Sequence, residues 1–176
     1  NNLIETLEAW DIQLVKYGSE VIKYREKFIK HLGEVCQKIH NKLTGGKEKI
    51  LLEYDRDVGY DSYLTELAKK RQKDLKYSTT TVGPHRDDIS FIVNGIDIRK
   101  YGSQGQQRTA ALSLKLAQIQ LMREVMKESP ILLLDDVLSE LDSNRKTYLL
   151  ESIKDTQTII TCTGPVSYTH LRAHET

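Results

Sequence analysis

The chain has 176 residues, 39% of them hydrophobic and 29% charged, which fits one domain, or one domain with an appendage, with a core of its own. Its 26 Lys and Arg residues nearly balance 25 Asp and Glu residues, so the net charge of +1 neither requires nor excludes a nucleic-acid partner. The apolar runs are too short for a membrane-spanning helix. The two cysteines, Cys36 and Cys162, stand far apart and fit buried thiols in a reducing compartment better than a disulfide or a zinc site.

Residues 1 to about 43 are expected to be helical, because apolar side chains recur at every third or fourth position. This spacing predicts one long helix, or two helices joined near Gly18. The stripe fits a helix that covers a core, and it also fits a projecting coiled-coil-like arm. It consists of Leu3, Leu7, Trp10, Leu14, Tyr17, Val21, Tyr24, Phe28, Leu32, Val35 and Ile39.

The next segment reads as a glycine turn at 44–47, a short strand at 50–54 and a helix at 61–75 with Asp61-Ser62 as its cap. Together with the first helix, these elements predict a helical arm over residues 1–76. The second helix carries a basic cluster, which is either a solvated helix face or a contact for DNA phosphates. The cluster consists of Lys69, Lys70, Arg71, Lys73 and Lys76.

Residues 77–164 have the pattern of an α/β fold. A β-hairpin is predicted over residues 89–98, with its turn at Asn94-Gly95, because both residues tolerate positive φ. A helix at 106–126 is apolar nearly all round and should be buried, and the run at 131–134 is typical of a central parallel strand. A helix at 142–153 and a strand at 157–162 complete a βαβ unit. Residues 165–176 continue no pattern, and we expect them to be an unpacked, non-native read-through tail.

The run at 131–134 ends in two acids, Asp135 and Asp136. Ligands of α/β proteins bind at the carboxyl edge of the sheet. There the first acid can hold Mg²⁺, directly or through water, and the second can orient or deprotonate a water that attacks a γ-phosphate. The alternative is that the acids only cap the next helix.

A glycine-rich turn from Tyr101 to Arg108 leads into the 106–126 helix. Its glycines let the backbone approach a ligand closely, and the free N–H groups of a helix N-terminus attract an anion. A plain loop with a helix cap is the alternative. A second turn, from Ser139 to Asp142, follows the acids, and Asp142 can cap the next helix.

The order of these motifs resembles the carboxyl half of an ABC-type ATPase head. Residues 103–106 look like the signature motif, Asp135 and Asp136 look like Walker B and the catalytic carboxylate, and residues 139–142 look like the D-loop. The amino-acid sequence is similar to that of the RecF family of bacterial recombination and gap-repair ATPases over roughly residues 1–164. The segments 83–88, 101–117 and 135–142 carry this similarity.

The resemblance implies an α/β P-loop NTPase head of the SMC/Rad50 type that lacks its amino-terminal half here and carries a helical arm. It implies that Asp135 binds Mg²⁺ and that Asp136 polarises the attacking water. The residues implied to contact ATP across a dimer seam are Ser103, Gly105, Gln106, Ser139 and Asp142.

The family also implies ATP-dependent homodimerisation and binding to gapped DNA and to junctions of single- and double-stranded DNA. It implies help in loading RecA together with RecO and RecR, a weak ATPase in the full-length protein, and a cytoplasmic, nucleoid-associated location with no membrane partner. Two other interpretations stay open: a different SMC/Rad50-type head, and a non-enzymatic DNA-binding or scaffold module.

The chain departs from the ATPase pattern in one large respect. No Gly-x-x-x-x-Gly-Lys-Ser/Thr sequence occurs in it, so we expect it to begin inside a longer protein and to be inactive on its own. Cys162 stands where transporters carry a switch histidine, which argues against a histidine contact to the γ-phosphate. His85 and Arg86 fit a structural strand-end role as well as a contact to DNA or nucleotide.

Overall fold

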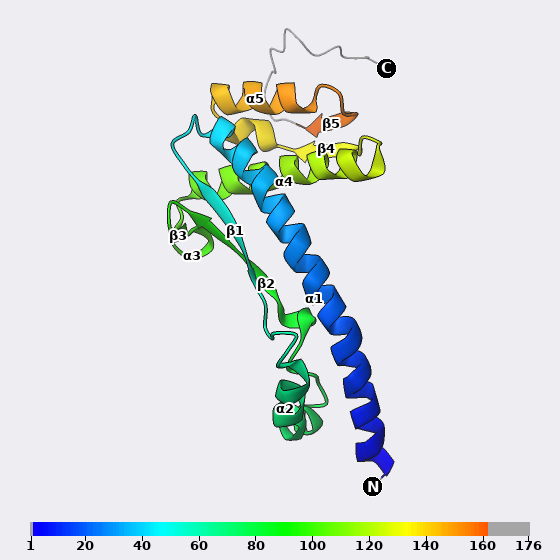
Figure 1. Ribbon diagram of the computed structural model, residues 1–176. Coiled ribbons are helices and arrows are strands. Elements are labelled where there is room, and N and C mark those ends of the chain that lie inside the picture. The colour runs from blue at the N-terminus through cyan, green and yellow to red at the C-terminus, as the bar shows by residue number, and fades with distance from the viewer. Residues whose placement is uncertain (1, 162–176) are drawn as a thin grey trace.

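The computed structural model describes residues 2–161, in which two lobes are joined by one long helix (Figure 1). The elements in chain order are α1 (Asn2–Leu43), β1 (Ile50–Asp55), α2 (Tyr63–Tyr77), η1 (Pro84–Arg86), β2 (Asp88–Val93), β3 (Ile96–Asp97), α3 (Ile98–Tyr101), α4 (Gln104–Met126), β4 (Leu132–Asp135), η2 (Val137–Glu140), α5 (Ser143–Ile153) and β5 (Thr158–Thr161). Cys162 and the tail at 165–176 lie outside the described residues. No helix within 2–161 is both long enough and apolar enough to cross a membrane.

The first helix, α1, is one continuous helix through Gly18, as the periodicity allowed. Its apolar stripe is divided between two environments. In the carboxyl-terminal half Leu32, Val35 and Ile39 are buried, whereas in the first half the stripe is exposed at Trp10, Leu14, Tyr17, Val21, Tyr24 and Phe28. The helix therefore covers a core with its last turns and projects as an arm with its first ones.

An antiparallel sheet of order β1-β2-β3 runs beside the carboxyl-terminal half of α1. Ile50 of β1 pairs with Val93 of β2, and Asp55 pairs with Asp88. The predicted hairpin is confirmed: Asn94 and Gly95 both have positive φ, at 49° and 84°. The last residue expected in the hairpin, Ile98, instead starts α3, because Asp97 caps that short helix by accepting a hydrogen bond from the N–H of Arg99.

The βαβ unit is confirmed by the parallel pairing of β4 with β5 between α4 and α5 (Figure 1). Within residues 2–161, β4 is not a central strand: β5 is its only neighbour there, and Leu133 is 70% exposed. Helix α4 is buried along its middle, but its last turn leaves Val125 and Met126 exposed.

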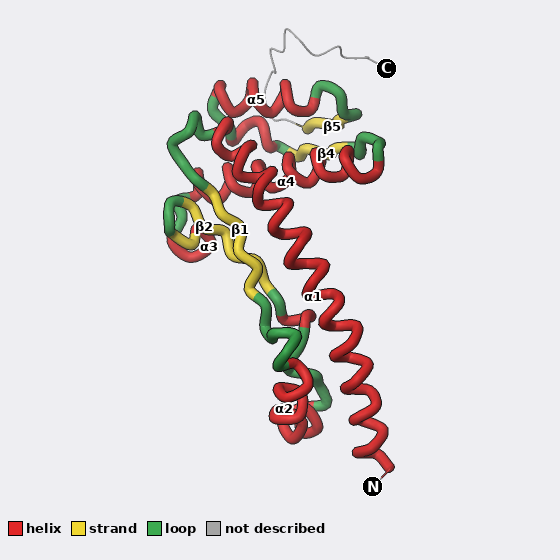
Figure 2. The backbone as a smooth tube through the Cα atoms, viewed as in Figure 1, coloured by secondary structure: helices red, strands yellow, loops and turns green. Residues whose placement is uncertain are grey.

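The main core lies where α1, the β1–β2–β3 sheet, α4, β4 and α5 meet. A smaller second core lies at the other end, where α2 and its flanking loops meet α1 (Figure 2). It is built around Tyr63, together with Ile22, Val58, Leu67 and Val82. The cap of α2 differs from expectation: Ser62 occupies the N-cap position, but its hydroxyl donates to the carbonyl of Gly59. Cys36 is buried as predicted.

Candidate nucleotide-contact site

The two acids lie exposed at the carboxyl end of β4. The hydroxyl of Thr161 on β5 donates to Asp135 Oδ1, so the neighbouring strand orients that carboxylate. Asp136 follows in the left-handed region at φ 51°, and its N–H donates to the carbonyl of Thr161 at 3.2 Å. The hydroxyl of Ser139 donates to the carbonyl of Asp136 at 2.8 Å. Backbone strain in a non-glycine residue that its neighbours hold in place is typical of functional sites.

This pair of carboxylates fits the ligand set of Mg²⁺, which proteins often bind through one or two carboxylates and the phosphates of a substrate. Within residues 2–161 no three His, Cys, Asp or Glu side chains gather closely enough to hold a metal ion. Any Mg²⁺ here would therefore take its other ligands from phosphates and water. Asp136 occupies the N-cap position of η2, but its side chain makes no capping hydrogen bond, so the capping alternative is not what fixes that carboxylate.

Asp142 caps α5, as its position suggested, by accepting a hydrogen bond from the N–H of Arg145 at 3.0 Å. This backbone hydrogen bond holds the pKa of Asp142 below its usual value, and the positive charge of Arg145 lowers it further. Ser139 and Asp142 are both exposed. The turn after the acids therefore presents a hydroxyl and a charged carboxylate to the surface.

The turn before α4 forms a capping box. Ser103 Oγ accepts from the N–H of Gln106 at 3.2 Å, and Gln106 Oε1 accepts from the N–H of Ser103 at 3.1 Å. The plain capping role is thus present, and it leaves the first N–H groups of the helix, at Gln104 and Gly105, directed out of the helix end. Ser103, Gln104 and Gly105 are exposed. A second molecule can therefore reach this helix end.

The two glycines of the turn differ in what surrounds them. A Cβ added at Gly102 would lie 2.6 Å from the carbonyl oxygen of Ile98, so packing within the chain requires a glycine there. A Cβ added at Gly105 would meet only Ser103 Oγ, at 4.0 Å. Nothing within residues 2–161 requires a glycine at position 105.

Helix α4 and strand β4 run in opposite directions, so the carboxyl end of β4 is directed toward the side of the lobe on which α4 begins (Figure 1). The larger lobe thus carries an exposed pair of carboxylates and an exposed helix N-terminus. A phosphate chain with its metal suits the first, and the terminal phosphate of such a chain suits the second.

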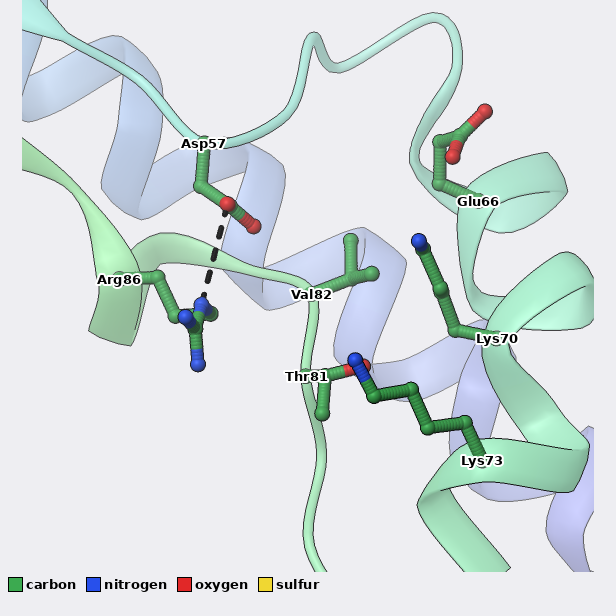
Figure 3. A pocket seen from close by; sticks show the side chains of 7 residues that line it. All are labelled: Asp57, Glu66, Lys70, Lys73, Thr81, Val82 and Arg86. Carbon is green, nitrogen blue, oxygen red and sulfur yellow. Dashed lines mark ion pairs between the residues drawn. The ribbon is translucent and has the colours of Figure 1, made fainter.

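The structure divides the predicted basic cluster on α2. Lys69 pairs with Glu66 at 2.7 Å, Lys76 lies over the ring of Tyr77, and Arg71 reaches across to Asp11 on α1. The two remaining lysines, Lys70 and Lys73, instead line a cavity of about 290 Å³ between α2 and the segment before β2 (Figure 3). The other residues that line it are Asp57, Glu66, Thr81, Val82 and Arg86.

Three cations from two segments meet at this cavity: Lys70, Lys73 and Arg86 (Figure 3). Arg86 is 3.9 Å from Asp57, and no ion pair joins Lys70 or Lys73 to another of the described residues. The sequence pattern had left the role of Arg86 open. Because Arg86 lies outside α2, on η1, only the tertiary fold reveals that it shares a cavity with Lys70 and Lys73.

Most of the Gly83–Asp88 block is structural. The ring Nε2 of His85 is 2.8 Å from the carbonyl of Thr80, and the carboxylate of Asp87 accepts from the hydroxyl of Tyr54 and from Arg25. A buried histidine, His40, was missed altogether. The only signal for it in the sequence is its place beside Ile39, on a helix face that is otherwise apolar.

Comparison with known proteins gives a consistent result. No protein-family model matches the chain. The chain is 58% identical over 163 residues to the DNA replication and repair protein RecF of Agathobacter rectalis. These aligned residues make up 93% of this chain and 45% of the relative. It is 57% identical over 162 residues to RecF of Lachnospira eligens, again covering 45% of the relative. The chain thus spans about half the length of the curated relatives it matches.

The same relationship holds in three dimensions. The solved structure of the recombination mediator protein RecF-ATP in the RecFOR pathway matches with a TM-score of 0.80 at 38% identity, over 91% of this chain and 45% of that one. A RecF-ATPrS structure matches with a TM-score of 0.77. The fold is that of the carboxyl-terminal part of an ABC-type ATPase head with its helical arm. From its sequence and its fold, the chain belongs to the RecF family.

Proposed function

We propose that the full-length protein carrying this chain is a DNA repair protein that dimerises when it binds ATP. Asp135 would hold Mg²⁺, and Asp136 would orient the water that attacks the γ-phosphate. The proposal is supported by the family relationship and by the RecF-ATP structures among the similar folds. The RecF relationship alone supports the further roles: binding at DNA gaps in the cytoplasm, and help in loading RecA with RecO and RecR.

The single observation that carries the proposal is the open space over Gly105. A glycine in the first turn of a helix costs stability relative to alanine. Here no atom of residues 2–161 requires that glycine, and the turn is exposed. A close approach by something outside this chain explains the residue. A phosphate bound to a second head is such a group.

The chain's own residues divide the work in this mechanism. Mg²⁺, held by Asp135, would neutralise negative charge on the phosphates of ATP. Thr161 and Ser139 hold the backbone of Asp136. The carboxylate of Asp136 would accept a hydrogen bond from the attacking water and so direct its lone pair at the phosphorus. From the partner head, the N–H groups at the start of α4 and the hydroxyl of Ser103 would stabilise the negative charge on the γ-phosphate.

We assign the contact with DNA phosphates to Lys70 and Lys73, with Arg86 as a third cation. These side chains line one cavity, and the other cations of α2 are already engaged by Glu66, by the ring of Tyr77 and by the acids of α1. Clustered cations lower the free energy of phosphate binding and release counterions. This assignment narrows the predicted cluster of five basic residues on α2 to Lys70 and Lys73, and it adds Arg86 from η1.

Two substitutions in the full-length protein test the proposal, because they should have opposite effects. Gly105→Ala should keep or slightly raise the thermal stability, by about 0.5–1 kcal/mol, yet abolish ATP-dependent dimerisation. Asp136→Asn should stop hydrolysis and increase the fraction of ATP-bound dimer. Gly59→Ala, where a Cβ meets only Ser62 Oγ at 3.4 Å, serves as the control. Normal dimerisation of the Gly105 variant would contradict the proposal.

The 176-residue chain by itself should bind ATP no better than in the millimolar range, because its sequence contains no phosphate-binding loop with a lysine. Calorimetry measures this directly. Submicromolar binding would mean that this chain contains a binding site for the β- and γ-phosphates, and it would contradict the prediction.

A further inference from the structure

A hydrogen-bonded network surrounds His40, in the last turns of α1. His40 is fully buried, and so is Ser113 of α4. The ring Nδ1 lies 2.9 Å from Ser113 Oγ, and the ring Nε2 lies 3.2 Å from Glu48 Oε2 in the loop between α1 and β1. A carboxylate only accepts hydrogen bonds, so Nε2 carries a proton and donates it to Glu48.

The order serine, histidine, glutamate is that of a hydrolase triad, but its surroundings exclude that role. Ser113 and His40 have no exposed surface, and Ser113 Oγ is 2.7 Å from the carbonyl of Thr109 within its own helix. No substrate reaches this hydroxyl. The network can therefore only position the residues that are hydrogen-bonded to it.

The network reaches the turn before α4 by two routes. Glu48 Oε1 accepts from Gln106 Nε2 at 3.2 Å, and Gln106 completes the capping box with Ser103. In addition, Ser113 lies one turn after Thr109 in α4, and the hydroxyl of Thr109 donates to the carbonyl of Gly105 at 2.6 Å. Both routes end on residues assigned above to contact with the partner's ATP.

The network also borders the second partner-facing turn. Burial lowers the pKa of His40, Glu48 opposes that shift, and the positive charge of Arg145 on α5 adds to it. Arg145 in turn pairs with the carboxylate of Asp142 at 3.4 Å. Helix α5, which follows the turn at 139–142, packs against α1 in the main core.

We propose that His40 and Glu48 are positioning residues that tie the partner-facing turn at 103–106 to the carboxyl end of α1. The proposal rests on the proposed function, since it assigns to these residues the alignment of that turn for ATP-dependent dimerisation. A change at Gln106 on contact with the γ-phosphate moves Glu48, and with it His40 and the end of the arm helix.

The arm helix is suited to carry such a movement. Its 42 residues span about 63 Å at 1.5 Å per residue. Toward its other end Asp11 pairs with Arg71 of α2, and Arg25 donates to the carbonyl of Pro84 in η1. The same two elements supply Lys70, Lys73 and Arg86 to the basic cavity. The network therefore joins the nucleotide contact to the proposed DNA contact through one rigid element.

The test replaces Glu48 in the full-length protein and compares four quantities. These are the affinity of the monomer for ATP, the ATP-dependent dimerisation constant, kcat, and the hydrogen-exchange rates of the amides at 103–107. Glu48→Ala should weaken dimerisation and lower kcat by about tenfold each. It should leave ATP affinity within about twofold and raise amide exchange at 103–107. Glu53→Ala, an exposed acid on β1, is the matched control.

The outcomes separate this inference from the proposed function. If the wild type dimerises with ATP and Glu48→Ala matches Glu53→Ala in dimerisation and kcat, the inference is wrong. If ATP affinity falls as much as dimerisation does, Glu48 is only structural and the inference is also wrong. If the wild type does not dimerise, the proposed function fails, and the exchange rates at 103–107 still decide the inference. Should Glu48→Ala not fold, Glu48→Gln and His40→Asn replace it in the same comparison.

Discussion

Gly83 lies against the phenol ring of Tyr63. A Cβ built at Gly83 would lie 3.1 Å from Cζ of Tyr63 and closer still to its hydroxyl oxygen, and φ at Gly83 is 137°. A Cβ built at Gly18 of α1 would lie 2.7 Å from Cε1 of the same ring. Two glycines far apart in the chain thus form the slot that holds the central side chain of the smaller core.

Gly83→Ala should therefore destabilise the protein by about 2–4 kcal/mol, because it adds both backbone strain and a clash with a fully buried ring. Chemical denaturation measures the free energy of unfolding. Gly59→Ala, at a glycine without positive φ, should change it by less than about 0.5 kcal/mol. Equal stability of the two variants would mean that the Tyr63 slot is not rigid.

Tyr54 and Asp87 predict an unusual phenol titration. Burial raises the pKa of Tyr54 to about 12, and the hydrogen bond and negative charge of Asp87 contribute to the shift. Because the folded-state pKa is raised, this group's contribution to stability is complete below the unfolded value near 10 and is lost as the pH rises through about 12. Asp87→Asn should bring the phenol titration of Tyr54 to lower pH.

Absorbance of the phenolate measures this titration, and the difference between wild type and Tyr54→Phe isolates the signal of Tyr54. The side chain of Asp87 is only 2% exposed, and it also accepts from the N–H of Asp57 at 2.9 Å. Asp87→Asn should therefore cost about 1–3 kcal/mol of stability as well. An unchanged Tyr54 titration in that variant would contradict the assigned cause.

Local patterns in the sequence were enough to predict the longer helices and the strands, but not α3, η1 or η2. The long helix, the hairpin at Asn94-Gly95 and the strand that ends in Asp135 each depend on residues close together in the chain. The periodicity of α1 did not predict which side chains are buried in each half of the helix. Gly18 and Ile22 are buried because α2 packs on that face, while Trp10 and Tyr24, on the apolar stripe, are exposed.

The candidate site shows the same division. The acids and the glycine turn were identified from their residue types and order. The grouping of Lys70 and Lys73 with Arg86 was not, because it depends on η1 lying beside α2. The His40–Glu48 network was not identified from the sequence either. A lone histidine in a helix does not indicate that its hydrogen-bond partner, Ser113, lies 73 positions away.

His40 predicts a dependence of stability on pH. Burial lowers its pKa below the ordinary 6.5, so the folded protein favours the neutral ring. A depressed folded-state pKa gives a contribution that is complete above the unfolded value and is lost as the pH falls below about 6.5. The free energy of unfolding should thus fall from pH 7 toward pH 5 more steeply in the wild type than in His40→Gln. An equal slope in the two proteins would contradict the prediction.

The basic cavity predicts a specific change in the salt dependence of DNA binding. Each phosphate contact that is lost should reduce the slope of log affinity against log salt by about 0.9 on duplex DNA and about 0.7 on single strands. The double variant Lys70→Ala with Lys73→Ala in the full-length protein should weaken binding to gapped DNA several-fold and lower that slope by nearly two. Titrations at several salt concentrations measure both quantities.

Lys69→Ala is the matched control, because it removes the same charge from the same helix at a side chain already paired with Glu66. It should leave the slope almost unchanged. If Lys69→Ala reduces the slope as much as the loss of Lys70 or Lys73 does, the helix contributes only diffuse positive charge, since a screened field does not distinguish neighbouring lysines. A difference between these lysines requires phosphates close to the cavity, where Arg86 adds the third cation.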